Sequence, residues 1–260
     1  MAARTLMGVY AHPDDESTCA GGVFAHYADQ GVRVIVVTCT NGEFGDGPNG
    51  IKPGQDGHDI DVVVATRAAE LDAACRRLGV SVVERLGYHD SGMPGWERHA
   101  RGEVFSTVPV QAVAARIVDL LNQHRPDVVL THNATADHEH RDHRHAARAT
   151  ALAVAGSGAK LYFSAHGAAH WQRLRQALPQ LARPKSQKQC ALDLIDARIT
   201  TRIDIRHVVA RKRAALFEHV SQLGSSLAGE LSLDQYEAVF GVESFIRVDG
   251  DTTGNDLFDG

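Results

Sequence analysis

The sequence predicts an α/β fold: a Rossmann-like, mostly parallel and doubly wound sheet, with a smaller C-terminal portion that walls the pocket. Several short runs rich in β-branched residues lack clean polar alternation, which indicates strands buried on both faces of a parallel sheet. These runs alternate with segments whose apolar residues recur at helical spacing, as in βαβ units. Ligands of such sheets bind at the carboxyl ends of the strands, so we expect function to cluster there.

The predicted elements of the N-terminal half follow one another with mostly short links. Strands are predicted over residues 5–11, 32–38, 80–86 and 127–131, and helices over residues 19–30, 61–78 and 110–124. Gly31 and Gly79 follow the first two helices directly, which is a common way for a helix to end. Residues 41–59 and 89–108 are longer stretches rich in Gly and Pro. Such stretches are commonly lids or specificity loops, although we interpret their outer residues as solvated insertions.

The pattern becomes less regular after residue 165. We predict a helix and linker over residues 171–188, an alternating strand over 199–205, a helix over 208–223 and a further run over 243–248. We expect residues 1–260 to form a single domain. Residues 1–165 would be its Rossmann-like core, and residues 166–260 would complete the fold.

Composition limits the classes of partner. The chain has 260 residues, of which 43% are hydrophobic and 23% charged, and its formal net charge is -5, so no basic field exists to attract nucleic acid. No apolar run approaches the roughly 20 residues that span a bilayer. The 4 cysteines lie far apart without CxxC spacing, which is the pattern expected of reduced thiols. We therefore expect a cytoplasmic protein that acts on a small molecule, without a nucleic-acid or membrane partner, and leave a homo-oligomer open.

Side chains able to carry chemistry gather where the first predicted strand ends, in the run AHPDDE of residues 11–16. A catalytic divalent metal such as zinc needs a few nitrogen and oxygen ligands, an open position for water, and a nearby carboxylate that accepts a proton. Asp14 and Asp15 are adjacent and point in different directions, so one could ligate while the other acts as base. Helix capping would explain one acid, but not His12 together with both aspartates.

A second cluster follows the fourth predicted strand. Five of the 15 histidines lie between His132 and His145. If the first and fourth strands are neighbours, His140, Asp142 or His143 would approach the first cluster. For His132, Glu139 and His145 we favour a solvated polar loop.

These residues resemble the PIG-L or LmbE-like superfamily of zinc-dependent N-deacetylases, which have AHPDDE after the first strand and a later His-x-Asp-His, here HRDH at residues 140–143. Further matches cover nearly the whole chain: TCTNGE at 38–43, RAAE at 67–70, GYHDSGM at 87–93, KRAALFEHVSQ at 212–222 and ESF at 243–245. The DSGM and HVSQ pieces make the chain most similar to the actinobacterial branch that handles mycothiol. That branch comprises a biosynthetic deacetylase and an amidase of mycothiol S-conjugates.

The resemblance implies a zinc site held by His12, Asp15 and His143. Three protein ligands leave an open position on the metal. Histidine and carboxylate ligands also suit Fe2+ and other divalent ions, so the metal used in the cell stays open.

The resemblance also implies roles around the metal. Asp14 would be the general base, and His140 would donate to the oxyanion or to the leaving amine. Asp142 would orient His140, while Arg67 and Asp90 would grip the sugar.

One departure from the mycothiol enzymes concerns substrate choice. Those enzymes carry Gly-Gly-Tyr-x-His-Pro-Asp-His, where this chain has ADHEHRDH at residues 136–143, so the proline is absent and His138 replaces tyrosine. We expect His138 either to line the mouth of the site and bind substrate or to be a solvent-facing loop residue.

The expected function is therefore zinc-dependent hydrolysis of an N-acyl (acetyl) group from an N-acetylglucosaminyl-type amino sugar. Alternatives are an amidase of mycothiol S-conjugates and a non-catalytic metal-binding protein, which would need the ligands but neither Asp14 nor His140. A dinucleotide-binding oxidoreductase is disfavoured, because carboxylates in the first βα turn repel a pyrophosphate and GxGxxG is absent there.

Overall fold

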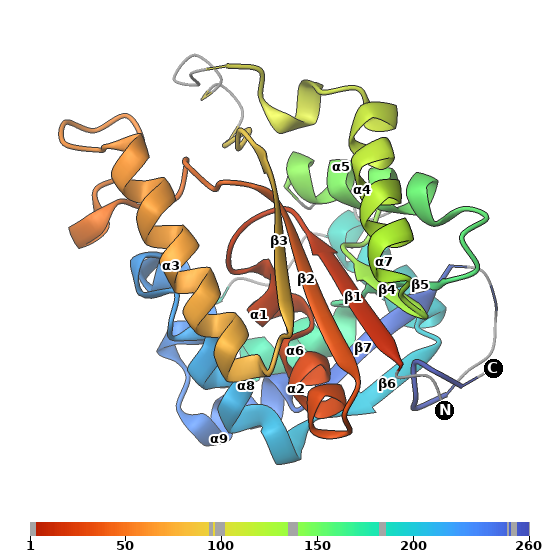
Figure 1. Cartoon of the computed structure of the whole chain (residues 1–260). Helices are drawn as coiled ribbons and strands as arrows, with labels where there is room; N and C mark the ends of the chain where they lie inside the picture. Colours follow the sequence, from red (N-terminus) through yellow and green to blue (C-terminus); the bar gives the residue numbers. More distant parts are fainter. Residues whose placement is uncertain are drawn as a thin grey trace.

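A computed structural model describes residues 4–93, 96, 102–134, 140–181, 186–248, 250 and 254–259 (Figure 1). In this part of the chain a seven-stranded sheet has the order β3-β2-β1-β4-β5-β7-β6. The strands are β1 (Thr5–Tyr10), β2 (Arg33–Thr40), β3 (Val82–Tyr88), β4 (Val128–Thr131), β5 (Lys160–Ser164), β6 (Thr201–Asp204) and β7 (Val242–Arg247). Strands β1 to β5 are parallel, and β7 pairs antiparallel with both β5 and β6. The predicted mostly parallel α/β fold is confirmed.

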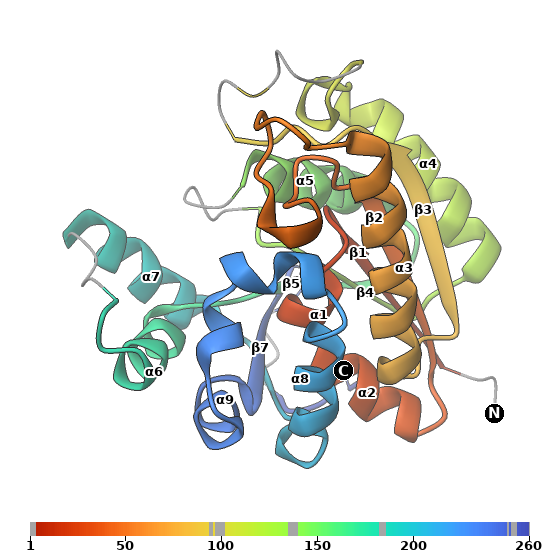
Figure 2. The ribbon, with the colours of Figure 1, turned by 90° about the vertical axis from the view of Figure 1, so that its left-hand side faces the viewer.

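Helices cover both faces of this sheet. They are α1 (Asp15–Cys19), α2 (Gly21–Asp29), α3 (Ile60–Leu78), α4 (Val110–His124), α5 (Arg141–Val154), α6 (Ala168–Ala177), α7 (Ser186–Arg198), α8 (Val209–Leu216) and α9 (Leu233–Phe240). Buried side chains of α2, α3, α8 and α9 form one core cluster, and those of α4, α5 and α7 form another. Figures 1 and 2 show α3 and α4 on opposite sides of the sheet.

Strand β1 contributes to both clusters because its side chains alternate between the faces. Leu6 and Tyr10 pack in the first cluster, while Met7 and Val9 pack in the second. All six residues of β1 are buried, as the unalternating sequence predicts. Strand β1 is therefore buried between the two helical layers.

Several predicted elements differ from the structure. The helix expected over 19–30 corresponds to α2, and a separate short helix, α1, precedes it. The helix expected over 208–223 ends at Leu216, with a 3-10 helix over Val220–Ser225. The helix and linker expected over 171–188 correspond to α6 and the start of α7. Gly31 and Gly79 have φ of 78° and 77°, so both helix-ending glycines adopt the left-handed conformation.

A buried ion pair joins the C-terminal segment to the first half. Lys212 Nζ lies 2.6 Å from Glu243 Oε1, and these residues are 1% and 5% exposed. The Glu243 carboxylate also accepts hydrogen bonds from the backbone N–H groups of Gly22 and Val23 at the start of α2. Strands β6 and β7 also extend the common sheet, so the C-terminal segment is joined to the first half by both strand pairing and this ion pair.

Glu243→Ala is expected to reduce the free energy of unfolding by about 3–5 kcal/mol, because it leaves the Lys212 ammonium buried without its carboxylate. Denaturant unfolding measures the change. Adding Lys212→Met should recover part of the loss, since the unpaired charge is then removed. A double variant less stable than Glu243→Ala alone would contradict this explanation.

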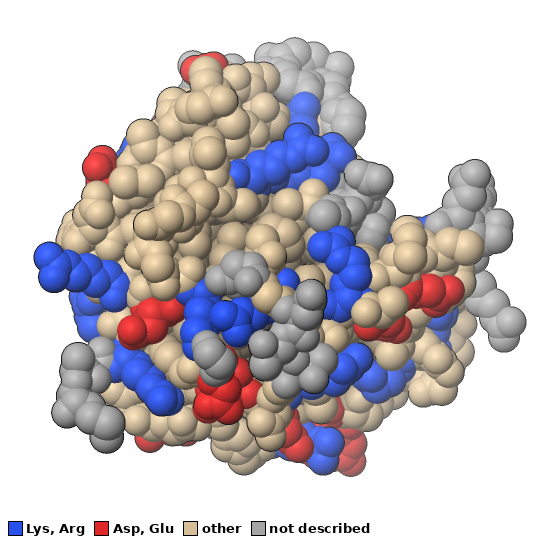
Figure 3. All heavy atoms as spheres, turned by 90° about the vertical axis from the view of Figure 1, so that its right-hand side faces the viewer, with Lys and Arg blue, Asp and Glu red and all other residues tan. Residues whose placement is uncertain are grey.

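Basic and acidic side chains lie interspersed on the face shown in Figure 3, so that face presents mixed charge. None of the helices in the described part of the chain has the length and apolar character required to cross a bilayer.

Candidate metal centre and active site

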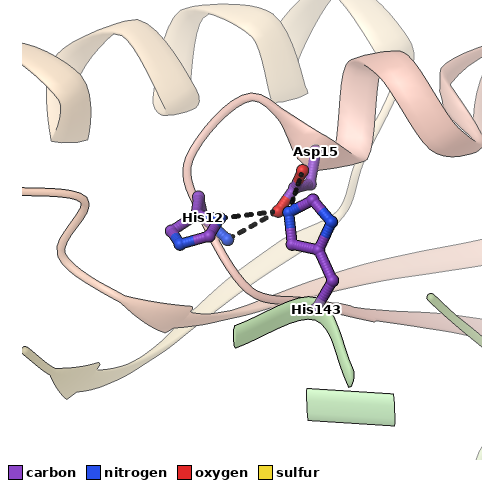
Figure 4. Close-up of side chains that lie close together, drawn as sticks. All are labelled: His12, Asp15 and His143. Atoms are coloured by element: carbon purple, nitrogen blue, oxygen red, sulfur yellow. Dashed lines mark hydrogen bonds and ion pairs between the residues drawn. The ribbon is translucent and has the colours of Figure 1, made fainter. Parts of the chain in front are cut away.

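The two chemical clusters of the sequence meet because β1 and β4 are neighbouring parallel strands, with Val9 paired to Thr131. His12 and Asp15 follow β1, and Asp15 is the first residue of α1. His143 lies in the first turn of α5, beyond the end of β4. Figure 4 shows these three side chains converging from the loop after β1, the start of α1 and α5.

His12, Asp15 and His143 form a group that fits a divalent metal. Their nitrogen and oxygen ligand atoms all lie within 4.8 Å of one another. Asp15 Oδ2 is 3.3 Å from His12 Nδ1, and Asp15 Oδ1 is 3.3 Å from His143 Nε2, as drawn in Figure 4. Two imidazoles and one carboxylate are a donor set that zinc accepts, with room for further ligands.

The surroundings of Asp15 favour the ionised form of its carboxyl group. Burial favours its neutral form, but the neighbouring imidazoles, His143 first among them, outweigh burial and hold the pKa of Asp15 well below its usual range. The backbone N–H of His12 also donates to Asp15 Oδ2 at 2.7 Å. The carboxylate is thus fixed in the charged form that ligates a metal.

Asp14 precedes Asp15 in the turn after β1, lines the same cavity and has an unusual backbone. Its φ of 130° is in a region that residues other than glycine rarely adopt. The side chain accepts a hydrogen bond from Arg67 Nη2 at 3.0 Å. Burial, opposed by Arg67 and reinforced by Asp15, raises the pKa of Asp14. Backbone strain of this kind is often found at functional sites, and a carboxylate with a raised pKa suits a general base.

Comparing Asp14→Gly with Asp14→Ala isolates this strain, because both variants lose the same carboxylate. The glycine variant is expected to be more stable by about 1–3 kcal/mol, since only alanine keeps a Cβ at positive φ. Denaturant unfolding at equal metal content measures the difference. An alanine variant as stable as the glycine variant would show that the backbone relaxes here.

Two buried side chains, Glu16 and His219, form a chain of contacts that begins at the backbone of Asp14. Glu16 Oε2 accepts the Asp14 N–H at 2.9 Å, while Glu16 Oε1 lies 2.8 Å from His219 Nε2. Burial opposes both charges, but each partner outweighs it, which lowers the pKa of Glu16 and raises that of His219. Glu16 and His219 are 1% and 0% exposed, so this pair ties the C-terminal segment to the strained turn.

Asp142 has different contacts from those expected. Its Oδ2 accepts the Ser91 N–H at 2.9 Å and lies 3.4 Å from His12 Nε2. Its backbone N–H, rather than its carboxylate, pairs with His140 Nδ1 at 3.3 Å. Asp142 is therefore placed to orient His12, and its carboxylate also lies within 4.8 Å of a ring nitrogen of His140.

His12 has further acidic neighbours. Asp90 Oδ1 lies 3.4 Å from His12 Nε2. Burial lowers the pKa of His12, but Asp90, Asp142 and Asp15 outweigh burial and raise the pKa well above the usual value. His140 lies nearby, with ring centroids 4.9 Å apart, and burial followed by the charge of His12 lowers the pKa of His140.

A cavity of about 570 Å³ opens over these groups. The residues expected to form the site that also line this cavity are His12, Asp14, Asp15, Arg67, Asp90, His140 and His143. The rest of its wall includes Phe44, Met93, Trp96 and Gln222. Arg67 is only 3% exposed. It donates to the carbonyl of Gly42 at 2.7 Å and forms an ion pair with Asp14 at 3.0 Å. His138 and Glu139 lie outside the described residues.

Two histidines are placed differently from the solvated loop that we expected. His132 is 2% exposed, and burial followed by the charge of His143 lowers its pKa to about 4. His145 lies on α5 with its ring 4.8 Å from that of Phe105. Their positions follow from the packing of α5 over the end of β4, which a run of histidines in the sequence does not reveal.

Fold and site together define the class: an α/β protein with a three-residue candidate metal site and an adjacent buried carboxylate, an arrangement suited to metal-assisted hydrolysis. The sequence model of the PIG-L family, described as GlcNAc-PI de-N-acetylase, matches residues 7–154. The chain belongs to this family.

A relative from Acidothermus cellulolyticus, 1D-myo-inositol 2-acetamido-2-deoxy-alpha-D-glucopyranoside deacetylase, is 36% identical, with 99% of this chain and 95% of the relative covered. The prediction of an N-deacetylase, an enzyme that hydrolyses an amide bond, is confirmed at this level of class.

Solved structures share the fold. The 4-carboxy-2-hydroxymuconate hydratase GalB of Pseudomonas putida is 20% identical with a TM-score of 0.65, covering 97% of this chain and 99% of its own. N,N'-diacetylchitobiose deacetylase of Pyrococcus horikoshii is 20% identical with a TM-score of 0.59, covering 95% and 84%. Because a hydratase and a deacetylase share this fold, the reaction must be argued from the site.

Proposed function

We propose that this protein is a zinc-dependent N-deacetylase of an amino sugar of the N-acetylglucosaminyl type. The observation that carries the proposal is the convergence of His12, Asp15 and His143 beside the Asp14 carboxylate in one cavity. The A. cellulolyticus relative, which acts by name on an acetamido-glucopyranoside of myo-inositol, supports a glucosaminyl inositol as the substrate. Iron(II) is the alternative metal for the same ligands. The four cysteines are present as thiols, which fits a reducing compartment and so supports a cytoplasmic location.

Each group in the cavity has a role in this proposal. When bound, the metal would polarise the acyl carbonyl and lower the pKa of a water molecule. Asp14 would accept the proton of the attacking water, and Arg67 would hold the Asp14 carboxylate in place. His140 would stabilise the developing oxyanion or protonate the leaving amine. Asp90 and Arg67 would contact the sugar, and Asp142 would orient His12.

The proposal is tested by measuring amine release together with metal content. The substrate panel contains N-acetylglucosaminyl inositol, free N-acetylglucosamine, N,N'-diacetylchitobiose and a mycothiol S-conjugate. Release of acetate and amine from the acetylated sugars by the metal-loaded protein is expected, with N-acetylglucosaminyl inositol fastest. Cleavage of the S-conjugate alone would identify the amidase instead. A fully metal-loaded protein that cleaves no member of the panel would refute the proposal.

Arg67→Ala is expected to lower kcat as well as raise KM. The guanidinium restrains Asp14, and a misplaced catalytic group can reduce the rate by about 10²-fold. Steady-state kinetics on the fastest substrate separates the two parameters. Asp46→Asn is the comparison, because Asp46 also lines the cavity but its carboxylate pairs with Lys52, so kcat should stay near the parental value. An unchanged kcat in Arg67→Ala would leave Arg67 with substrate binding alone.

A further inference from the structure

His132 contacts residues of the candidate metal site, although it belongs to neither the expected ligand set nor the expected catalytic set. It follows the last residue of β4, Thr131, and is 2% exposed. It does not line the cavity. A buried polar ring at this position needs partners, and the partners that it has are informative.

The ring of His132 contacts two of the three candidate metal ligands. It is stacked on the ring of His143, with centroids 3.9 Å apart and planes inclined by only 4°. Its Nε2 also lies 3.3 Å from Asp15 Oδ2. A single side chain therefore limits both the plane of one ligand and the position of another.

His132 is itself held from three sides. The backbone N–H of Ala11, next to His12, donates to His132 Nε2 at 3.0 Å. Nδ1 faces the Cys19 sulfur at 3.9 Å, and the Tyr10 ring meets the imidazole edge-on at 5.1 Å. Because an amide N–H can only donate, Nε2 carries the lone pair and Nδ1 carries the proton.

These contacts argue against His132 as a metal ligand, although Asp15, Cys19 and His132 also lie within metal-binding distance of one another. The lone pair of Nε2 is occupied by the Ala11 amide, and the protonated Nδ1 points at sulfur. The approach to Asp15 is thus a packing contact of the ring edge. The His132 ring therefore provides a fixed surface against which His143 and Asp15 pack.

We propose that His132 is a positioning residue of the metal centre, which holds His143 and Asp15 in the orientation that binds the metal. The proposal rests on the proposed metal site. Ligands already fixed before binding lose less conformational freedom when the metal arrives, so a rigid support increases affinity. Groups that orient metal ligands in this way typically change affinity about 10–100-fold when mutated.

The test compares His132→Ala and His132→Phe with a matched control, His124→Ala. His124 is also a buried histidine with two polar partners, Glu84 and Arg33, but it lies at the end of α4 and contacts no candidate ligand. Zinc affinity is measured by competition with a chromophoric chelator. The absorption spectrum of the Co²⁺-substituted protein reports ligand geometry, and circular dichroism reports folding.

We expect His132→Ala to bind zinc about 10–100-fold more weakly and to alter the Co²⁺ spectrum. His132→Phe keeps a flat ring against His143 and should lie between His132→Ala and the parent protein. His124→Ala should keep parental affinity and spectrum, even if its melting temperature falls.

The outcomes separate this inference from the proposed function. Parental affinity and spectrum in folded His132→Ala would overturn the inference while leaving the metal site intact. A parent protein that binds no metal would overturn the proposed function and the inference with it. Failure of both His132 variants to fold, with zinc present, would show that the ring supports the fold rather than the ligands, which also overturns it.

Discussion

Asp14→Asn is expected to lower kcat by about 10²–10⁴-fold while the metal stays bound, because asparagine keeps the shape of the side chain but cannot accept the proton of the attacking water. The expectation depends on Asp14 lying beside the ligand group and outside it. Its carboxylate contacts Arg67, whereas the ligand atoms come from His12, Asp15 and His143.

The measurement combines kcat on the fastest amino sugar with metal content per chain. Asp46→Asn is a matched control: Asp46 also lines the cavity, but its carboxylate pairs with Lys52. That variant should keep most of the parental kcat. If Asp14→Asn loses its metal, Asp14 is a ligand; if it turns over near the parental rate, the base lies elsewhere.

The centre of the fold could be predicted from the sequence because its signals are local. A strand buried on both faces has a continuous apolar run, as β1 does, and the polar run after it must then lie at the carboxyl edge. The sequence left open whether the first and fourth strands are neighbours, and the structure pairs them in parallel, which brings the residues after β4 to the residues after β1.

Other features could not be predicted because contacts between distant residues determine them. The helix expected over 208–223 ends at Leu216, after which His219 pairs with Glu16 and Ser221 donates to Glu70 at 2.7 and 2.8 Å. These partners lie 203 and 151 residues away along the chain, and local helix propensity carries no information about them.

The burial of His132 was missed for a similar reason. A histidine in a polar run after a strand is typical of a loop, and only the packing of α1 and α5 over the end of β4 encloses it. The backbone strain at Asp14 is likewise visible only in the structure, because the sequence HPDDE does not predict a positive φ at this residue.

His143→Ala is expected to lose the metal and to reduce activity by at least about 10³-fold, because a metal Lewis acid contributes several kcal/mol and each 1.4 kcal/mol corresponds to about tenfold in rate. His143 supplies the imidazole from α5, so without it only His12 and Asp15 remain from the turn after β1. Two ligands from one short turn are a poor substitute for three that enclose the ion.

Metal content after dialysis and amine release measure both effects. His145→Ala is the matched control, since it removes an imidazole two residues further along α5 whose ring packs on Phe105 instead of the ligand group. It should keep its metal and its activity. His138→Ala tests the choice among the neighbouring histidines: if that variant loses the metal while His143→Ala retains it, the third ligand comes from His138, and the contact between His143 and Asp15 at 3.3 Å would then serve only to orient the carboxylate.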